Sequence, residues 1–289
     1  MRIYLHINYF ETDTDLPTAL VETRALGATG LEFRRVPNGL HRGGDGDYLD
    51  QISRAWDRNP VSEVSFGAPG PNLMLADRGR REAELEAVCA FYARAVKRFP
   101  VKVINLLLGE LINPDESIPL TRFSRQGSSL ATAEQWEWAV EGCRVLAALA
   151  GDYHFQFGLE THGIYLHDTV AVARRLVERV DRRGQIGITW DHANEYLFDE
   201  TPDMEVSLET CLDRLFYVHL KNLFTYAGGG YRICGLSEGR IDVRQQCKLL
   251  ASAGFDGPVA IESPRQGDRL HFLQQDFAYL EELLAISAP

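Results

Sequence analysis

The sequence predicts a single (β/α)₈ barrel, the TIM-barrel fold, from two observations. Short apolar runs alternate with amphipathic segments almost from end to end of the 289 residues, which is the pattern of parallel strands joined by helices. The alternation repeats eight times, and eight such units close a barrel. No linker, internal repeat or low-complexity segment interrupts the chain. We therefore expect one domain over residues 1–289.

Each element of the barrel is predicted from local signals. The eight strands are the apolar runs, at residues 2–9, 30–36, 61–67, 101–108, 154–161, 185–191, 215–221 and 258–262. The helices follow from capping residues and helical spacing, at residues 15–27, 48–58, 78–99, 132–149, 168–180, 208–215, 242–253 and 270–286. Asp15, Asp168 and Asp242 are expected N-caps. Thr132 and Gln135 form a capping-box pattern.

The alternative fold is an open, doubly wound sheet. That fold would need a glycine-rich phosphate turn after an early strand, and neither G-x-G-x-x-G nor GxxxxGK[ST] occurs in such a position. The run Gly228-Gly229-Gly230 comes late, after the seventh strand. We expect it to form a loop rather than a phosphate site.

The composition excludes several classes of protein. Hydrophobic residues make up 45% of the chain and charged residues 25%, which is ordinary globular usage and argues against disorder. The net charge of −11 argues against a nucleic-acid partner, because such affinity comes largely from Lys and Arg. No stretch approaches the roughly 18 consecutive apolar residues of a membrane span.

The cysteines point to a reducing compartment. Five are present, scattered, odd in number and without a CxxC spacing: Cys89, Cys143, Cys211, Cys234 and Cys247. The chain also begins directly with a strand-like run and shows no basic-plus-apolar leader. We expect buried free thiols and a cytoplasmic location.

Metal-type side chains end four consecutive strands. They are Glu160, Asp191, His219 and Glu262, on the fifth to the eighth strand. In a barrel the active site lies at the carboxyl ends of the strands. Because side chains alternate along a strand, and the neighbours of these four are apolar, all four should point into the barrel mouth.

Four ionisable groups at one point need a neutralising charge. Taken singly, each residue would more often be a helix cap, a solvated group or a structural histidine. Together they would repel one another, or lose solvation, unless a cation held them. Three carboxylates and one imidazole suit one divalent ion of the Mn²⁺ or Mg²⁺ type, with Zn²⁺ or Co²⁺ as alternatives.

The segments LETHG, TWDHAN, VHLKN, LSEGRID and AIESP, in this order, resemble the xylose isomerase-like barrel superfamily. Its sugar isomerases and epimerases, related to tagatose 3-epimerase and inosose dehydratase, are the most similar in style. The resemblance covers the whole chain in architecture, and its specific motifs lie between Glu160 and Glu262. It implies that Glu160, Asp191, His219 and Glu262 bind the metal, and that the two glutamates also form the acid/base pair.

The resemblance also indicates substrate contacts and one departure. His162 matches a position that often lines the substrate site. The family's sixth strand often ends Asp-x-x-His, whereas this chain has Asn194 in place of the later histidine. The endonuclease branch needs several more His and Asp ligands, and the first half of the chain offers only His6 and His41. With the acidic charge, this argues against DNA repair.

Two cations near the strand ends are further candidates. Lys221 shares a strand face with His219 and could bind a substrate oxygen; alternatively it forms a salt bridge with Asp191 or Glu160. Arg265 could bind a hydroxyl or phosphate group, or be a solvated residue of the rim.

Polar residues at the ends of the second and sixth strands are further candidates. Glu32, with Arg34 or Arg35 at the end of the second strand, could contact substrate or form an internal ion pair that fills the barrel. His192 points away from its neighbour Asp191 by strand alternation, so we expect it behind the ligands.

The predicted function is isomerisation or epimerisation of a small keto sugar or polyol through an enediolate. The metal would polarise the carbonyl, one of Glu160 and Glu262 would take a carbon-bound proton, and the other would return it. The first alternative is a lyase or dehydratase, of the inosose or dehydroshikimate type or one that cleaves a keto-glycoside. The second is a non-catalytic sugar-binding or partner subunit. A homo-oligomer is left open.

Overall fold

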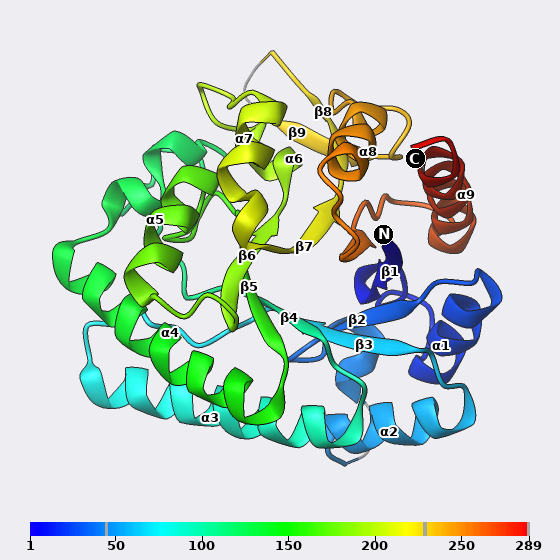
Figure 1. Cartoon of the computed structure of the whole chain (residues 1–289), viewed down its shortest axis with the longest axis horizontal. Helices are drawn as coiled ribbons and strands as arrows, with labels where there is room; N and C mark the ends of the chain where they lie inside the picture. The colour runs from blue at the N-terminus through cyan, green and yellow to red at the C-terminus, as the bar shows by residue number, and fades with distance from the viewer. Residues whose placement is uncertain (44–45, 228–229, 288–289) are drawn as a thin grey trace.

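Eight parallel strands form the central sheet in the computed structural model, which describes residues 1–43, 46–227 and 230–287 (Figure 1). The strands are β1 Arg2–His6, β2 Gly30–Arg34, β3 Glu63–Gly67, β4 Val103–Leu106, β5 Gln156–Glu160, β6 Ile186–Trp190, β7 Leu215–Leu220 and β10 Pro258–Ile261. Their order is β3-β2-β1-β10-β7-β6-β5-β4. A parallel bridge between Val64 and Val101 joins the β3 side to the chain entering β4, so the barrel is nearly closed. The predicted single-domain TIM barrel is confirmed.

Helices surround the sheet. They are α1 Leu16–Ala25, α2 Tyr48–Arg58, α3 Arg78–Arg98, α4 Ala133–Tyr153, α5 Val170–Val180, α6 His192–Glu195, α7 Met204–Cys211, α8 Val243–Ser252 and α9 Arg269–Ser287. Single 3₁₀ turns occur at Ile7–Tyr9, Gly39–Gly43, Phe123–Arg125, Gly127–Leu130 and Leu212–Arg214. Asp15 and Asp242 accept backbone N–H bonds as helix caps, and both bonds of the Thr132–Gln135 capping box form. None of the helices in the described residues could span a membrane.

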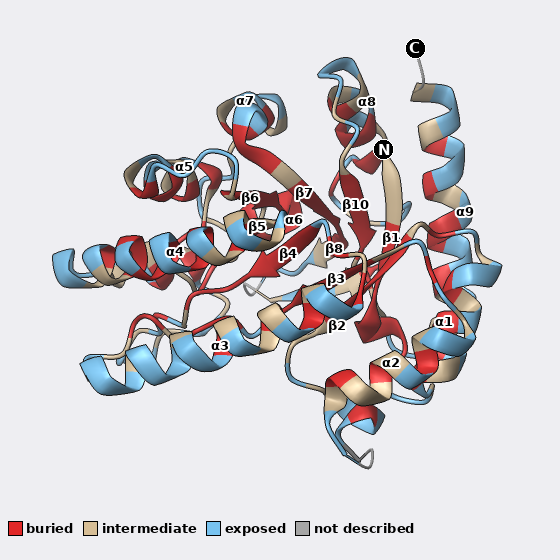
Figure 2. Cartoon of the chain, turned by 60° about the horizontal axis from the view of Figure 1, so that its bottom comes forward, coloured by how far each residue is buried: buried red, intermediate tan, exposed pale blue. Residues whose placement is uncertain are grey.

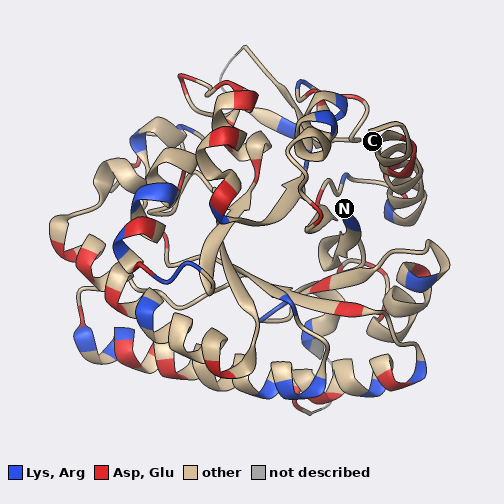
Figure 3. Ribbon diagram, in the orientation of Figure 1, with Lys and Arg blue, Asp and Glu red and all other residues tan. Residues whose placement is uncertain are grey.

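Burial separates the outer layer from the barrel interior. Figure 2 shows the strands buried, with the helices buried toward the sheet and exposed on the outside. Inside the barrel, Tyr4, Val103, Tyr217 and Ala260 pack together from four different strands. Toward the carboxyl ends of the strands the interior becomes polar, and this is where the candidate site lies. Along the outer helix α3, basic residues lie near both ends and acidic residues lie between them (Figure 3).

Several predicted boundaries are corrected. Each of the eight barrel strands is shorter than the predicted run. Residues 7–9, for example, form a 3₁₀ turn instead of extending β1. The helix predicted to end near residue 149 continues to Tyr153, where His154 ends it in a left-handed conformation. The helix predicted at 208–215 begins at Met204, because Asp203 caps it.

Two further differences concern the loops. Thr169, and not Asp168, caps α5, because Asp168 accepts a bond from Ser128 N at 2.7 Å across the loop. An antiparallel hairpin of β8 Asn222–Thr225 and β9 Tyr231–Cys234 follows β7, where the sequence indicated only a loop. Residues 228 and 229 of the triglycine lie outside the described residues, so the loop expected for them stays a prediction.

Candidate metal centre

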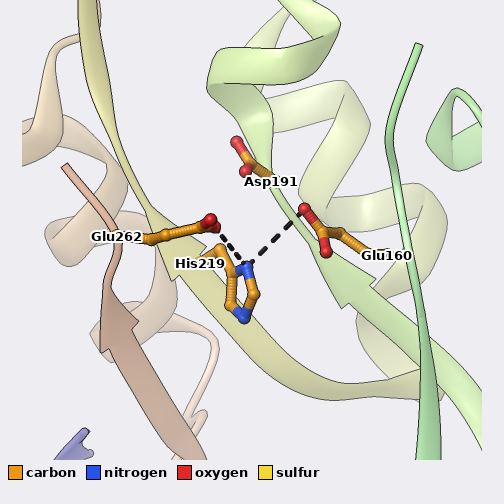
Figure 4. Close-up of side chains that lie close together, drawn as sticks. All are labelled: Glu160, Asp191, His219 and Glu262. Carbon is orange, nitrogen blue, oxygen red and sulfur yellow. Dashed lines mark ion pairs between the residues drawn. The ribbon is translucent and has the colours of Figure 1, made fainter. Parts of the chain in front are cut away.

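Glu160, Asp191, His219 and Glu262 meet at the carboxyl end of the barrel. Glu160 is the last residue of β5, Asp191 follows β6, His219 lies near the end of β7, and Glu262 follows β10. One ligand atom from each lies within 4.8 Å of those of the other three. Figure 4 shows Glu160 and Glu262 on two sides of the His219 ring, with Asp191 above it. The convergence expected from strand alternation is therefore what the fold produces.

Local structure orients the carboxylates of Asp191 and Glu160. Asp191 caps α6, so its Oδ1 accepts the backbone N–H of Asn194 at 3.1 Å, and Oδ2 is left for the cluster. Glu160 is held by two amides: Asn105 Nδ2 donates to Oε2 at 2.6 Å, and Asn194 Nδ2 donates to Oε1 at 3.3 Å. Asn194 also donates to Thr161 O at 2.9 Å, which orients its side chain.

Glu262 is held less firmly than Glu160. Its hydrogen bond comes from Asn8 Nδ2 and is long, at 3.4 Å from Oε1. Its side chain is 16% exposed, against 6% for Glu160. The two glutamates therefore differ in both access and restraint.

Two positive groups balance the carboxylates. Lys221 Nζ lies 2.7 Å from Asp191 Oδ2 and 3.3 Å from Glu262 Oε2. His219 Nδ1 lies 2.8 Å from Glu262 Oε2 and 3.6 Å from Glu160 Oε1. Of the two predicted roles of Lys221, the salt bridge to Asp191 is therefore formed.

Burial and charge act in opposite directions on the pKa values here. Burial opposes ionisation of Glu160, but His219 outweighs it and lowers the pKa of Glu160 to about 2. Burial likewise opposes ionisation of Glu262, and Lys221 is the largest of the positive groups that hold its pKa well below the usual range. For Asp191 burial prevails over Lys221 and raises the pKa to about 6. Both glutamates are thus ionised at neutral pH.

The donor set fits a divalent cation. Asp191 Oδ2, His219 Nδ1 and Glu262 Oε2 are buried and lie at ion-pair distances, yet none makes a hydrogen bond of acceptable geometry within the described part of the chain. Buried polar atoms in proteins are normally paired. Three carboxylates and one imidazole, with lone pairs turned to one point, are the ligands that Mn²⁺, Mg²⁺, Co²⁺ or Zn²⁺ takes in proteins.

Glu32 lies beneath this cluster, inside the barrel. It is fully buried, and its Oε2 accepts from Tyr217 OH at 2.6 Å and lies 3.0 Å from His219 Nε2. An internal ion pair with Arg34 or Arg35, one of the two alternatives considered from the sequence, is not formed. Arg34 Nε instead pairs with Glu11 at 2.6 Å, and Arg35 Nε donates to a backbone carbonyl.

The remaining candidates lie around the cluster to different extents. His162 is next to Phe123 and Tyr165, with ring centroids at 6.2 and 5.2 Å, and burial lowers its pKa. Arg265 is bound elsewhere: its guanidinium pairs with Asp276 at 2.6 Å and stacks over Phe272. A substrate contact by His162, Asn194, Lys221, Arg265 or Glu32 stays a prediction.

His192 is buried beside Trp190, and its Nδ1 lies 3.6 Å from Glu195 Oε2. It therefore faces away from Asp191, as strand alternation indicated. Within the described residues its contacts are with Trp190 and Glu195, and not with the four clustered side chains.

Sequence reasoning missed some residues that position the site. Asn105 and Asn8 each hold a glutamate, and Asn105 could have been found as the polar residue of an otherwise apolar strand. His167 joins two strand ends: its Nδ1 donates to Glu160 O at 2.5 Å, and its Nε2 accepts from Leu108 N at 3.3 Å. Burial lowers the pKa of His167 to about 4, so the ring is neutral. Nothing in its loop indicated this role.

Fold and site together define a TIM barrel whose strands carry a cluster of three carboxylates and one imidazole at their carboxyl ends. Residues 20–284 match the family model described as xylose isomerase-like TIM barrel. The chain therefore belongs to the xylose isomerase-like TIM-barrel family, as the sequence motifs indicated. No curated protein matches the sequence.

Solved structures share the whole architecture at low identity. D-psicose 3-epimerase from Clostridium cellulolyticum H10, crystallised with D-tagatose, is 19% identical with a TM-score of 0.74, covering 98% of this chain and 99% of that one. A xylose isomerase-like TIM-barrel protein from Mycobacterium smegmatis in complex with magnesium is 17% identical, with a TM-score of 0.75 and coverages of 100% and 98%. The probable 3-DHS dehydratase of petrobactin synthesis from Bacillus anthracis is 16% identical, with a TM-score of 0.75 and coverages of 97% and 99%. At these identities the likeness establishes the shared fold.

Proposed function

We propose that this protein is a divalent-metal-dependent isomerase or epimerase of a small keto sugar or polyol. One observation carries the proposal: two ionised glutamates, Glu160 and Glu262, approach the same point from two different strands. His219 and Asp191 complete the donor set. A site that only bound sugar would have no need for two opposed bases. The sugar epimerases among the structural neighbours support the same activity class.

A bound divalent cation would polarise the substrate carbonyl and stabilise the negative charge that develops when a neighbouring C–H proton leaves. The protein's own part is proton transfer. Because both pKa values are lowered, Glu160 and Glu262 are each ready to accept a proton at neutral pH. One takes the proton from the substrate carbon and later releases it to water. The other first takes up a proton from water and then delivers it to the opposite face or to the next carbon.

Lys221 and His162 would orient the substrate. Two ion pairs occupy two of the three donors of the Lys221 ammonium, and the third suits a substrate oxygen. The buried Nδ1 of His162 makes no hydrogen bond to the residues described in this structure, so a sugar hydroxyl is a fitting partner. We also propose a cytoplasmic location, which the five free cysteines support.

The test is hydrogen exchange in D₂O. The protein, loaded with Mn²⁺, should wash deuterium into one carbon of its keto-sugar substrate, measured by proton NMR across a panel of ketoses. Glu160→Gln and Glu262→Gln should each lower turnover by at least ~10²-fold, the usual scale of general acid/base catalysis. Glu63→Gln is the control, because Glu63 binds Arg2 and Tyr4 away from the cluster.

The pair of variants also separates the two glutamates. Changing the residue that removes the proton should stop exchange, whereas changing its partner should leave some exchange and block net conversion. If both variants keep near wild-type turnover, the proton-transfer proposal is wrong. Loss of a substituent from the product would instead identify a lyase, and no exchange in any sugar would favour a binding protein.

A further inference from the structure

Glu32 reaches His219 across the inside of the barrel. The two strands that carry them, β2 and β7, are separated in the sheet by β1 and β10. Glu32 is nevertheless 3.0 Å from His219 Nε2 through its Oε2, and the same oxygen accepts from Tyr217 OH at 2.6 Å. An ionised carboxylate can only accept hydrogen bonds, so Nε2 of His219 must carry a proton.

The other nitrogen of the ring is then the one turned to the cluster. His219 Nδ1 lies 2.8 Å from Glu262 Oε2 and 3.6 Å from Glu160 Oε1. Without a cation, Nδ1 faces a carboxylate as well, so the ring carries a positive charge. A bound cation would take the place of the Nδ1 proton, and the ring would keep the Nε2 proton that points to Glu32. By holding Nε2, Glu32 turns Nδ1 toward the cation site.

The surroundings of Glu32 hold it in this place. His6 accepts Asn8 N at its Nδ1, so its own proton is on Nε2, which lies 3.9 Å from Glu32 Oε1. Gly67 on the neighbouring strand leaves room for the same oxygen: a Cβ there would lie 2.3 Å from it. A fully buried carboxylate is costly unless hydrogen-bond donors face it, and here the Tyr217 hydroxyl and Nε2 of His219 do.

We propose that Glu32 is a positioning residue of the metal centre, which holds His219 so that Nδ1 binds the cation. The inference rests on the proposed metal-dependent function. Glu32 would act through His219, one of the proposed metal ligands. This role differs from the substrate contact considered from the sequence, which stays a separate prediction. Glu32 lies below the ligands and is fully buried. Carboxylates behind a ligating histidine typically contribute 10- to 100-fold to metal affinity.

The chain offers a matched control in Glu195. It is also fully buried and accepts three hydrogen bonds, from Val170 N, Trp190 Nε1 and Ser207 Oγ. A histidine, His192, lies 3.6 Å from it. Glu195 contacts none of the four clustered side chains through these bonds, so it shares the burial of Glu32 without its proposed role.

The experiment measures the binding of Mn²⁺ by calorimetry in the metal-free protein and its variants. Glu32→Gln should weaken binding by about 10-fold, because the amide oxygen still accepts from Nε2 but carries no charge, and Glu32→Leu by about 100-fold. Glu195→Gln should change the folding stability and leave the Mn²⁺ affinity within about 2-fold of wild type. Equal affinities of wild type and Glu32→Gln would overturn the inference.

A spectroscopic readout makes the test independent of whether the variants fold. In Co²⁺-loaded wild type with ¹⁵N-labelled histidine, a paramagnetically shifted, slowly exchanging N–H should be assigned to Nε2 of His219, with Nδ1 on the metal. An N–H on Nδ1 instead would refute the positioning role. If wild type binds neither Mn²⁺ nor Co²⁺, the proposed function itself fails, which no result on Glu32 alone would imply.

Discussion

Replacing Lys221 by methionine should weaken the fold and at the same time tighten metal binding. The ammonium lies 2.7 Å from Asp191 Oδ2 and 3.3 Å from Glu262 Oε2, so it neutralises two of the buried carboxylates that the cation would use. Removing one partner of a buried ion pair typically destabilises a protein by about 3–5 kcal/mol, because a charge is left without compensation. Metal-free Lys221→Met should lose stability on that scale.

With Mn²⁺ bound, the loss should be smaller. The cation brings two positive charges to the same oxygens, so only about 1–2 kcal/mol should then be lost with the lysine. The thermodynamic cycle requires the difference, about 2–3 kcal/mol, to appear as affinity. Lys221→Met should therefore bind Mn²⁺ about 30- to 150-fold more tightly than wild type.

The assay is urea unfolding with and without Mn²⁺, combined with calorimetric titration. Lys102→Met serves as the control, because Lys102 precedes β4 at the opposite end of the barrel and should affect neither measurement. Equal destabilisation of the metal-free and metal-loaded forms, or weaker Mn²⁺ binding by Lys221→Met, would refute the view that lysine and metal compete for the same carboxylates.

Three further predictions follow from the same structure. Dialysis against a chelator should lower the melting temperature and abolish turnover, with Mn²⁺ or Co²⁺ restoring both in calorimetry and rate assays; full activity in excess chelator would contradict this. Burial raises the pKa of Asp168 to about 7, so the native state holds a proton that the unfolded state lacks between about pH 4 and 7, and wild-type stability falls by up to about 4 kcal/mol as pH rises through that window. Asparagine does not titrate, so the free energy of unfolding of Asp168→Asn should rise relative to that of wild type over the same pH range, measured by urea unfolding. Parallel pH dependences of the two proteins would show the reasoning to be wrong. Gly67→Ala should displace Glu32 and weaken Mn²⁺ binding by about 10-fold in calorimetry. An unchanged Mn²⁺ affinity of this variant would contradict the prediction.

The fold could be predicted because the alternation of apolar strands and amphipathic helices is a property of local sequence. The convergence of the four clustered side chains could be predicted for a similar reason. Each of Glu160, Asp191, His219 and Glu262 is a polar residue at the end of an apolar strand, and the period of two assigns its direction. Parallel strands then bring their carboxyl ends to one edge, without any need to know the packing of the helices.

Features that depend on distant partners could not be predicted. Asp168 has the chemistry of a helix cap, but Ser128, 40 residues earlier in the chain, occupies its oxygen, and Thr169 caps α5 instead. Glu32 and His219 are 187 residues apart, and only the closed barrel brings them together.

The loops were predicted least well. The hairpin β8–β9 consists of two strands of four residues each, too short to show a clear alternation. Arg265 has a free charge in the sequence, but in the fold Asp276, on α9, holds it. In each case the deciding partner lies outside the local window.

Anomalous diffraction from crystals soaked in Mn²⁺ tests most directly whether the cluster is a metal centre. The expected result is one manganese peak within about 2.0–2.6 Å of a carboxylate oxygen of Glu160, Asp191 and Glu262 and of Nδ1 of His219, with Lys221 moved away from Asp191. No peak at these four residues in Mn²⁺-saturated crystals, or a peak bound only elsewhere, would contradict the central claim that they form a divalent-metal site.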